Sequence, residues 1–288
     1  MLVFSLLGLL YLSVWFINRH FNSASPSQVT SLAPLPVSAG LPPPGVTAKH
    51  VFILDRNSDY VLFQKDADSE IYPASITKIM TAIVAYEHFS LDTVITVDRT
   101  YPEGVDISLS PGEKIKVSDL LYALLVPSAN DAAEVLASGF PGGREAFVAA
   151  MNQQAADMHL RHTHFLNPTG LDQEGHYSSA ADLARIADKL LSFPYLAKIV
   201  STENAVISST DYSTTHSLSN VNQLLGRIDG VVGVKTGFTD LAGQSLVTLV
   251  KRDGHEVILS LLGSTDRFGD TEKLINWAFT AFTWSENP

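Results

Sequence analysis

Residues 73–81 read Pro73-Ala74-Ser75-Ile76-Thr77-Lys78-Ile79-Met80-Thr81, and the fold and chemistry that we expect for the chain follow from this stretch. Positions three apart lie on the same face of a helix, so Lys78 can sit beside Ser75 if a helix begins here. The preceding proline and the apolar positions that continue to Tyr86 favour that helix. A serine hydroxyl becomes a nucleophile when a base lies within hydrogen-bond reach, and a helix start offers free backbone N–H groups to an oxyanion.

The role of Lys78 depends on its protonation state. An unperturbed lysine has a pKa near ~10.4, so a lysine that acts as a base near neutral pH needs a pKa roughly three units lower. Burial and a second cation can lower the pKa in this way, and Lys235 is the candidate for that cation. A Lys78 that stays charged would act on the reaction only through its electric field.

Two further short motifs supply the other groups that such a reaction needs. Ser128-Ala129-Asn130 offers a second hydroxyl and an amide, and Lys235-Thr236-Gly237 offers a cation that can bind a carboxylate. Each motif is common when it occurs alone. Together and in this order they predict acyl transfer through a serine ester.

In their longer contexts the three motifs resemble the low-molecular-weight D-alanyl-D-alanine carboxypeptidases, a family of penicillin-binding proteins related to the serine β-lactamases. The contexts are 73–81, 125–133 (Leu-Val-Pro-Ser-Ala-Asn-Asp-Ala-Ala) and 234–239 (Val-Lys-Thr-Gly-Phe-Thr). The segment Asn167-Pro168-Thr169-Gly170-Leu171-Asp172, followed by His176-Tyr177-Ser178, resembles the family's loop beside the site. The resemblance covers about residues 48–284.

The resemblance implies a role for each catalytic group. Ser75 would be the acylated nucleophile and Lys78 its base. Ser128 would relay a proton between the nucleophile and the leaving amine, and Asn130 would hold the substrate amide.

The resemblance also implies a site for the end of the substrate. Lys235 and Thr236 would bind the terminal carboxylate of a peptide. The backbone N–H groups of Ser75 and of Phe238, the residue after Gly237, would form the oxyanion hole. Arg267 matches a family arginine that helps to hold the carboxylate region, and this assignment rests on spacing.

The function implied is that of an exported serine-type D-Ala-D-Ala carboxypeptidase that trims peptidoglycan stem peptides and is acylated by β-lactams. The alternatives are a DD-endopeptidase and a non-catalytic penicillin-sensing or cell-wall-binding module. A class A β-lactamase is less consistent with the sequence, because position 129 is Ala rather than Asp and no Glu-x-x-Leu-Asn separates the second and third motifs. A serine glutaminase of related fold would bind a small amino acid and would need no tether to a membrane.

Metal and cofactor chemistry is not expected. The spacings of His159, His162 and His164 fit no common zinc pattern, and the acyl mechanism requires no metal. His176 is expected to form hydrogen bonds in a loop, and Asp182 is expected at the polar face or start of a helix.

The chain is predicted to fold as an α/β protein of the α+β type. Val51–Leu54 and Tyr60–Phe63 are predicted as one hairpin, and 233–236, 244–250 and 256–262 are predicted as later strands. Helical apolar spacing marks 120–126, 131–136, 144–158, 180–191 and 271–282. This order predicts an antiparallel sheet made from both chain ends, flanked by helices and with an inserted helical subdomain. The resemblance implies the same serine β-lactamase/transpeptidase-like fold, with the site at the junction.

The N-terminal residues and the composition predict where in the cell the protein acts and which partners it lacks. Residues 2–17 form an uncharged apolar run, so 1–20 is predicted as a signal peptide or an N-terminal membrane anchor, 21–46 as a Ser/Pro-rich linker and 47–285 as the catalytic domain. We therefore expect the extracytoplasmic face of the cytoplasmic membrane, with the protein anchored or secreted. The net charge of −11 argues against a nucleic-acid partner, and the absence of cysteine excludes disulfides and cysteine catalysis.

Overall fold

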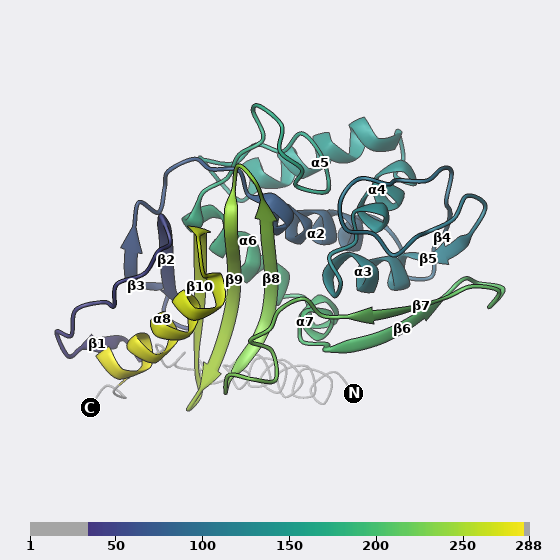
Figure 1. Ribbon diagram of the computed structural model, residues 1–288. Helices are drawn as coiled ribbons and strands as arrows, with labels where there is room; N and C mark the ends of the chain where they lie inside the picture. The colour runs from purple at the N-terminus through teal and green to yellow at the C-terminus, as the bar shows by residue number, and fades with distance from the viewer. Residues whose placement is uncertain (1–33, 285–288) are drawn as a thin grey trace, which may run out of the picture. The chain divides into compact units, whose positions relative to one another are not determined.

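A five-stranded antiparallel sheet forms the centre of the computed structural model, which describes residues 34–284 (Figure 1). Its strand order is β3 (Tyr60–Lys65), β2 (His50–Asp55), β10 (His255–Ser264), β9 (Gly243–Arg252) and β8 (Val231–Thr239). Two strands thus come from the start of the described chain and three from its last third. The helices between them form the insertion that the sequence predicts, and β8 is left at one edge of the sheet.

Helices cover both faces of this sheet. Helix α8 (Arg267–Ala281) packs on one face against β9 and β10, and α6 (Ala180–Leu191) packs on the other against β10 and β2 (Figure 1). Along β10, Leu259 lies in the core shared with α8, and its neighbour Ile258 lies in the core shared with α6. Alternate side chains of a strand point to opposite faces, which explains why the middle of β10, residues 257–262, is apolar on both faces apart from Ser260.

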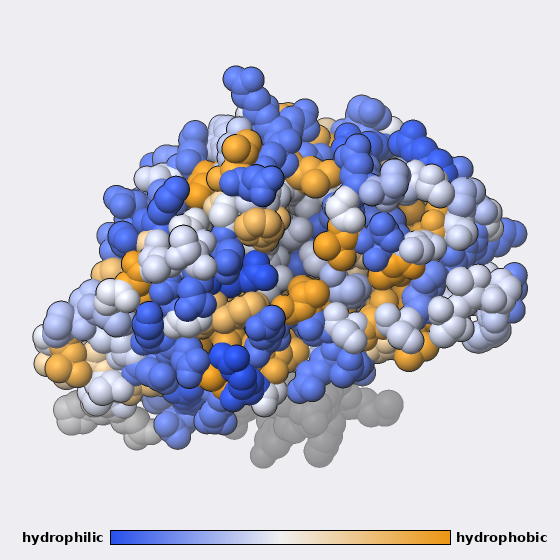
Figure 2. Space-filling model, viewed as in Figure 1, coloured by the Kyte–Doolittle hydropathy of each residue, from blue (hydrophilic) through white to orange (hydrophobic). Residues whose placement is uncertain are grey.

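The helical region beside the sheet contains α2 (Lys78–His88), α3 (Val117–Leu125), α4 (Asn130–Ser138), α5 (Gly143–Asp157) and α7 (Pro194–Val200) (Figure 1). Helix α2 contacts α3, α5 and α6, so the helix that follows the nucleophile motif lies in the middle of the apolar core. On the face shown in Figure 2, hydrophilic residues predominate and hydrophobic residues form several separate groups.

Three small antiparallel pairs complete the described fold, and the sequence analysis had predicted none of them. They are β4 (Val94–Thr96) with β5 (Lys114–Lys116), β6 (Asn204–Ser208) with β7 (Thr215–Ser219), and β1 (Pro36–Ser38) with β11 (Phe282–Trp284).

The predicted fold class and its main elements are confirmed, with differences at the ends of elements. A 3₁₀ turn, η1 (Ala74–Thr77), carries Ser75, and α2 begins only at Lys78. The last long helix begins four residues before the predicted Thr271, where the Asp266 side chain accepts the Gly269 N–H as a cap, and it ends at Ala281 because Phe282 pairs with β1.

The second half of the predicted linker lies against the folded unit. Residues 36–38 form β1, and Trp277 Nε1 donates to the Leu41 carbonyl at 3.1 Å. The apolar run at 2–17 and the first part of the linker lie outside the described residues. Between residues 34 and 284, no helix combines the length and the hydropathy that a membrane crossing requires.

Candidate active site

The Lys78 ammonium group is the point at which three of the predicted segments meet. Its Nζ atom lies 3.0 Å from Ser75 Oγ, 2.6 Å from Asn130 Oδ1 and 2.8 Å from the Thr169 carbonyl oxygen. The side chain is fully buried at the start of α2. The expected pairing of Ser75 with Lys78 through i,i+3 spacing is therefore present, and the loop at 167–172 contributes a backbone oxygen that the motifs did not indicate.

Burial lowers the pKa of Lys78 from 10.5 to about 7. The cause is desolvation, because the charged form loses its water in a closed site. The carboxylates of Glu134 and Asp131 oppose this effect without reversing it. A substantial fraction of Lys78 is therefore neutral near pH 7, and a neutral amine can accept the proton of the serine hydroxyl.

The nucleophile lies on a turn that two glycines allow. Ala74 has a left-handed φ of 50°, which turns the chain into η1, and no backbone acceptor binds the Ser75 N–H among the hydrogen bonds of the described residues. A Cβ atom at Gly170 would lie 1.8 Å from the Ala74 carbonyl oxygen, and one at Gly237 would lie 3.1 Å from the Ala74 Cβ. Both neighbouring segments thus approach the turn more closely than a larger residue would permit.

Replacing Gly170 by alanine is expected to lower both stability and activity. Gly170 has a φ of +87°, so alanine there is strained, and its Cβ would collide with backbone rather than with a flexible side chain. We expect a loss of roughly 3 kcal/mol in the free energy of unfolding, measured by denaturant titration. Gly175→Ala is the matched control, because Gly175 has the same φ but only a 3.4 Å contact with Leu166 Cδ1. Equal losses in the two variants would show that close packing against the nucleophile turn contributes nothing.

The second motif lies on a turn between α3 and α4, as the proline at 127 predicted. Ser128 has a left-handed φ of 71° and is buried. The Asn130 amide is held in one orientation, because its Oδ1 faces Lys78 and its Nδ2 donates to the Glu103 carbonyl at 2.7 Å. Among the described residues, no hydrogen bond joins the Ser128 hydroxyl to Ser75 or Lys78, so the proposed relay is not formed in this state.

The third motif lies on β8, at the edge of the sheet beside the nucleophile turn. Lys235 is 1% exposed, and its Nζ donates to the Thr236 carbonyl at 3.0 Å. Because β8 is an edge strand, one row of its N–H and C=O groups has no partner strand. Backbone groups two residues apart on a strand point to the same side, so the N–H of Phe238 points to the same side of β8 as the Thr236 carbonyl, which accepts from Lys235 Nζ. Phe238 lies one residue before the end of β8.

Two basic side chains lie at this edge, Lys235 fully buried and Arg267 half-buried. Burial, the charge of Lys78 and the charge of Arg267 lower the pKa of Lys235 well below its usual value. Arg267 Nη1 donates to the Gly237 carbonyl at 2.9 Å, so the arginine assigned from spacing does lie at the third motif. Its Nε atom is buried and without a partner among the described residues. This region is well suited to bind an anion.

The loop between the second and third motifs is fixed by polar contacts. Asn167 Oδ1 accepts the Gly170 N–H at 2.7 Å, which shapes the loop around the Thr169 carbonyl. The Leu166 N–H donates to His176 Nδ1, so the ring proton lies on Nε2, 3.0 Å from Thr77 Oγ1. Burial, with a smaller contribution from the charge of His164, lowers the pKa of His176 to about 4, so the ring is neutral near pH 7. The predicted role of His176 as a loop hydrogen-bonding residue is confirmed.

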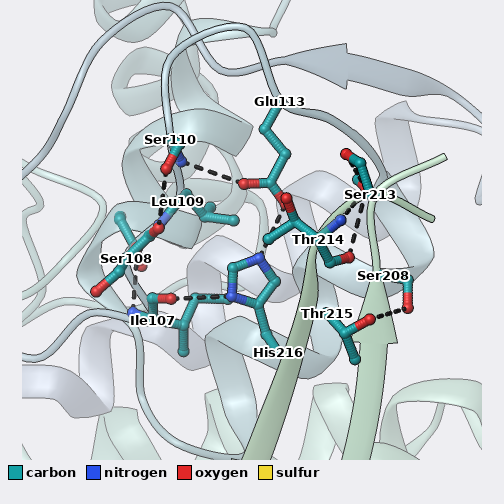
Figure 3. A network of polar contacts seen from close by, with 12 residues as sticks. Ile107, Ser108, Leu109, Ser110, Glu113, Ser208, Ser213, Thr214, Thr215 and His216 are labelled. Atoms are coloured by element: carbon teal, nitrogen blue, oxygen red, sulfur yellow. Dashed lines mark hydrogen bonds and ion pairs between the residues drawn. The ribbon is translucent and has the colours of Figure 1, made fainter. Parts of the chain in front are cut away.

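A buried pair that the sequence analysis did not predict, His216 and Glu113, holds the loop that contacts the second motif. His216 Nε2 lies 2.9 Å from Glu113 Oε1, and its Nδ1 lies 3.0 Å from the Ile107 carbonyl oxygen (Figure 3). Both ring nitrogens of His216 thus face oxygen atoms of the loop that carries Ile107 and Glu113. The same loop accepts the Asn130 N–H at the Val105 carbonyl, 2.6 Å away. The β6–β7 hairpin thus helps to hold the loop that fixes Asn130. The sequence gives no local signal for this contact, because His216 and Glu113 lie far apart in the chain.

Comparison with known proteins places the chain in a family. The family model described as D-alanyl-D-alanine carboxypeptidase, peptidase S11, matches residues 38–266. The chain belongs to this family. The resemblance inferred from the three motifs is therefore confirmed.

Individual relatives agree with this assignment. The chain is 33% identical to the D-alanyl-D-alanine carboxypeptidase DacF of Bacillus subtilis over 82% of its own length, and it spans 63% of the length of that relative. It is 32% identical to a D-alanyl-D-alanine endopeptidase of Pseudomonas aeruginosa, covering 90% of this chain and 86% of the relative. The crystal structure of the Streptomyces K15 DD-transpeptidase matches with a TM-score of 0.79 at 30% identity, over 83% of this chain and all of that one. The predicted transpeptidase-like fold is confirmed.

Proposed function

We propose that the chain is a serine-type D-Ala-D-Ala carboxypeptidase that trims peptidoglycan stem peptides. The observation that supports this most strongly is the buried Lys78, whose Nζ lies 3.0 Å from the Ser75 hydroxyl and whose pKa is lowered to about 7. A serine next to a lysine that is partly neutral near pH 7 is equipped for nucleophilic attack on an acyl group.

In the proposed acylation, Lys78 Nζ takes the proton of Ser75 Oγ as the oxygen attacks the carbonyl of the penultimate D-alanine. The N–H groups of Ser75 and Phe238 stabilise the oxyanion. The carbon–nitrogen bond then breaks, and the proton passes from Lys78 through the Ser128 hydroxyl to the leaving amine of the terminal D-alanine. Water cleaves the resulting ester and restores the Ser75 hydroxyl. A β-lactam would form the same ester and leave it slowly, because no loop glutamate of the β-lactamase type activates a water molecule.

The proposed binding site for the terminal carboxylate consists of Lys235, Thr236, Gly237 and Arg267. The low pKa of Lys235 in the free protein is consistent with this role, because a bound carboxylate would supply the opposite charge that favours the protonated amine. In this proposal, the bound carboxylate favours the protonated form of Lys235, and that form binds the carboxylate.

Replacing Lys235 by alanine is expected to weaken recognition of the free carboxylate. We expect kcat/KM to fall by roughly 100-fold for a peptide ending in D-Ala-D-Ala, because a buried charge-assisted hydrogen bond is lost. For the same peptide with an amidated terminus, wild type and variant should differ little. Steady-state kinetics on both peptides measures this difference, and equal losses on the two substrates would refute a carboxylate role for Lys235.

The release of D-alanine tests the proposed function directly. We expect an N-acylated tripeptide ending in D-Ala-D-Ala to lose its last residue, and the same peptide ending in D-Ala-L-Ala to remain intact. Absence of release from a folded protein would favour the non-catalytic penicillin-sensing or cell-wall-binding alternative. Cleavage of a cross-linked dimer in preference to the tripeptide would favour the DD-endopeptidase alternative, for which the Pseudomonas relative is named.

The proposed location is the cell envelope, at the extracytoplasmic face of the cytoplasmic membrane, because the proposed substrate lies there. In this proposal, residues 1–20 act as a signal peptide or an N-terminal anchor. The apolar run at 2–17 supports an export role.

A further inference from the structure

The loop between β4 and β5, residues 97–113, packs directly against Asn130. The Asn130 N–H donates to the Val105 carbonyl at 2.6 Å, and Asn130 Nδ2 donates to the Glu103 carbonyl at 2.7 Å. A Cβ atom at Gly104 would lie 2.3 Å from Asn130 Nδ2, so the loop backbone passes very close to this amide. A shift of the 97–113 loop would therefore move the Asn130 side chain.

Two side chains from outside the loop meet at Ile107. Asp131, the residue after Asn130, accepts the N–H groups of Ile107 and Leu109 at its Oδ2 atom, at 3.1 and 3.0 Å. His216 Nδ1 lies 3.0 Å from the Ile107 carbonyl oxygen (Figure 3). Ile107 is thus joined to α4 through its N–H and to strand β7 through its carbonyl.

His216 also reaches the end of the loop at β5. Its Nε2 atom lies 2.9 Å from Glu113 Oε1, and Glu113 Oε2 accepts the Ser110 N–H at 3.2 Å (Figure 3). The His216 and Glu113 side chains are 8% and 3% exposed, so water competes little for these contacts. One imidazole ring thus connects the middle of the 97–113 loop to its last residue.

The backbone next to Ile107 needs such support. Ser108 has a left-handed φ of 62°, a conformation that residues other than glycine keep only where their surroundings impose it. The contacts of Ile107 supply part of this constraint, and Asp106 Oδ1, which accepts the Ser108 N–H at 2.9 Å, supplies another part. Loss of the His216 contacts would let this part of the loop relax away from Asn130.

We propose that His216 and Glu113 are positioning residues for the acyl-transfer reaction and that they act on Asn130 through the 97–113 loop. This inference rests on the proposed function, and it gives the β6–β7 hairpin a role in catalysis. Asn130 Oδ1 lies 2.6 Å from Lys78 Nζ, so a displaced amide would disturb both the proposed substrate contact and the base. A displacement of about 1 Å in a catalytic group can lower a rate by about 100-fold.

His216→Phe tests the role, because it keeps a ring and removes both hydrogen-bond contacts. We expect kcat for D-alanine release to fall by about 30-fold and KM to change by less than about threefold, because the proposed carboxylate site on β8 is untouched. Glu113→Gln keeps an oxygen at the same place and should keep kcat within about threefold of wild type. His255→Phe, at a ring that stacks on Trp284, is the matched control and should leave kcat unchanged. All rates are measured well below the unfolding midpoint of each variant.

A double-mutant cycle shows whether the effect passes through Asn130. Asn130→Ala alone should lower kcat by about 100-fold, and adding His216→Phe to it should change kcat by less than about twofold. Glu113→Ala, which leaves no unpaired carboxylate, should lower kcat by about tenfold and replaces His216→Phe in the cycle if that variant does not fold.

Two results would overturn the positioning role and leave the proposed function standing. One is an unchanged kcat in both His216→Phe and Glu113→Ala. The other is an equal loss in the presence and absence of the Asn130 side chain, because the pair would then only stabilise the fold. Absence of D-alanine release from the wild type would contradict the proposed function and the positioning role with it.

Discussion

Ser75→Ala is expected to reduce the release of D-alanine by about 10⁴-fold or more, because the acyl group then has no oxygen to which it can transfer. The variant should fold normally. Ser75 lies on a 3₁₀ turn whose shape depends on Ala74 and on the glycines packed against it. Within residues 34–284 its hydroxyl oxygen has a single hydrogen-bond contact, with Lys78 Nζ. Thermal unfolding and the rate of release should be measured on the same preparation. Ser201→Ala, at an exposed serine that follows α7, is the matched control and should keep full activity.

The outcome for Ser75→Ala separates covalent from non-covalent chemistry. Residual release within tenfold of the wild-type rate would mean that another group attacks the peptide, or that water does so directly. That result would contradict the acyl-enzyme proposal even if the protein binds the substrate well.

The second large effect is expected at Lys78. Its neutral form is the base, and that form predominates above the pKa of about 7, so the rate of release should rise with pH through this value and level off above it. Lys78→Met should lower the rate by about 10³-fold, the loss typical of a missing general base, and should remove this rise with pH. Lys198→Met, at an exposed lysine on α7, should leave both the rate and its pH dependence unchanged.

A wild-type rate that stays constant between pH 5.5 and 8.5 would contradict the base role. Lys78 would then act as a fixed charge, the alternative that the sequence left open. A rate that falls as the pH rises through 7 would also contradict it, because the protonated amine would then be the active form.

The part of the site that could be predicted from the sequence is the part that depends on local geometry. Three-residue spacing at a helix start places Lys78 beside Ser75, and the proline at 127 predicts the turn that presents Asn130. The apolar pattern of β10, with buried side chains on both faces, reads directly as a central strand. These features require no knowledge of distant contacts.

The rest depends on tertiary contacts that leave little local trace. The Thr169 carbonyl reaches Lys78 because Gly170 lies against the nucleophile turn. Every residue has a backbone carbonyl, so the residue type at 169 could not predict this contact. The pairing of His216 with Glu113 joins residues far apart in the chain. Helix α7 is short and has proline at its first position, so its apolar spacing is too brief to stand out. The position of β8 at the edge of the sheet follows from the strand order, which the sequence does not reveal.

The strand β1 shows how context can override composition. Residues 34–46 are rich in proline and were expected to be part of a spacer, yet 36–38 pair with β11 at the end of the described chain. Proline is tolerated in a two-stranded edge pair of this kind, because it removes only one donor from the ladder. Residues 36–38 therefore belong to the folded unit rather than to a linker.

The central claim is that Ser75 forms an ester with its substrate. Mass spectrometry of the intact protein after incubation with a penicillin tests this claim most directly, followed by digestion to locate the adduct. We predict a mass increase of one penicillin molecule, carried by the peptide that contains Ser75 and absent from Ser75→Ala. An unmodified folded protein, or an adduct on a peptide without Ser75, would contradict the account.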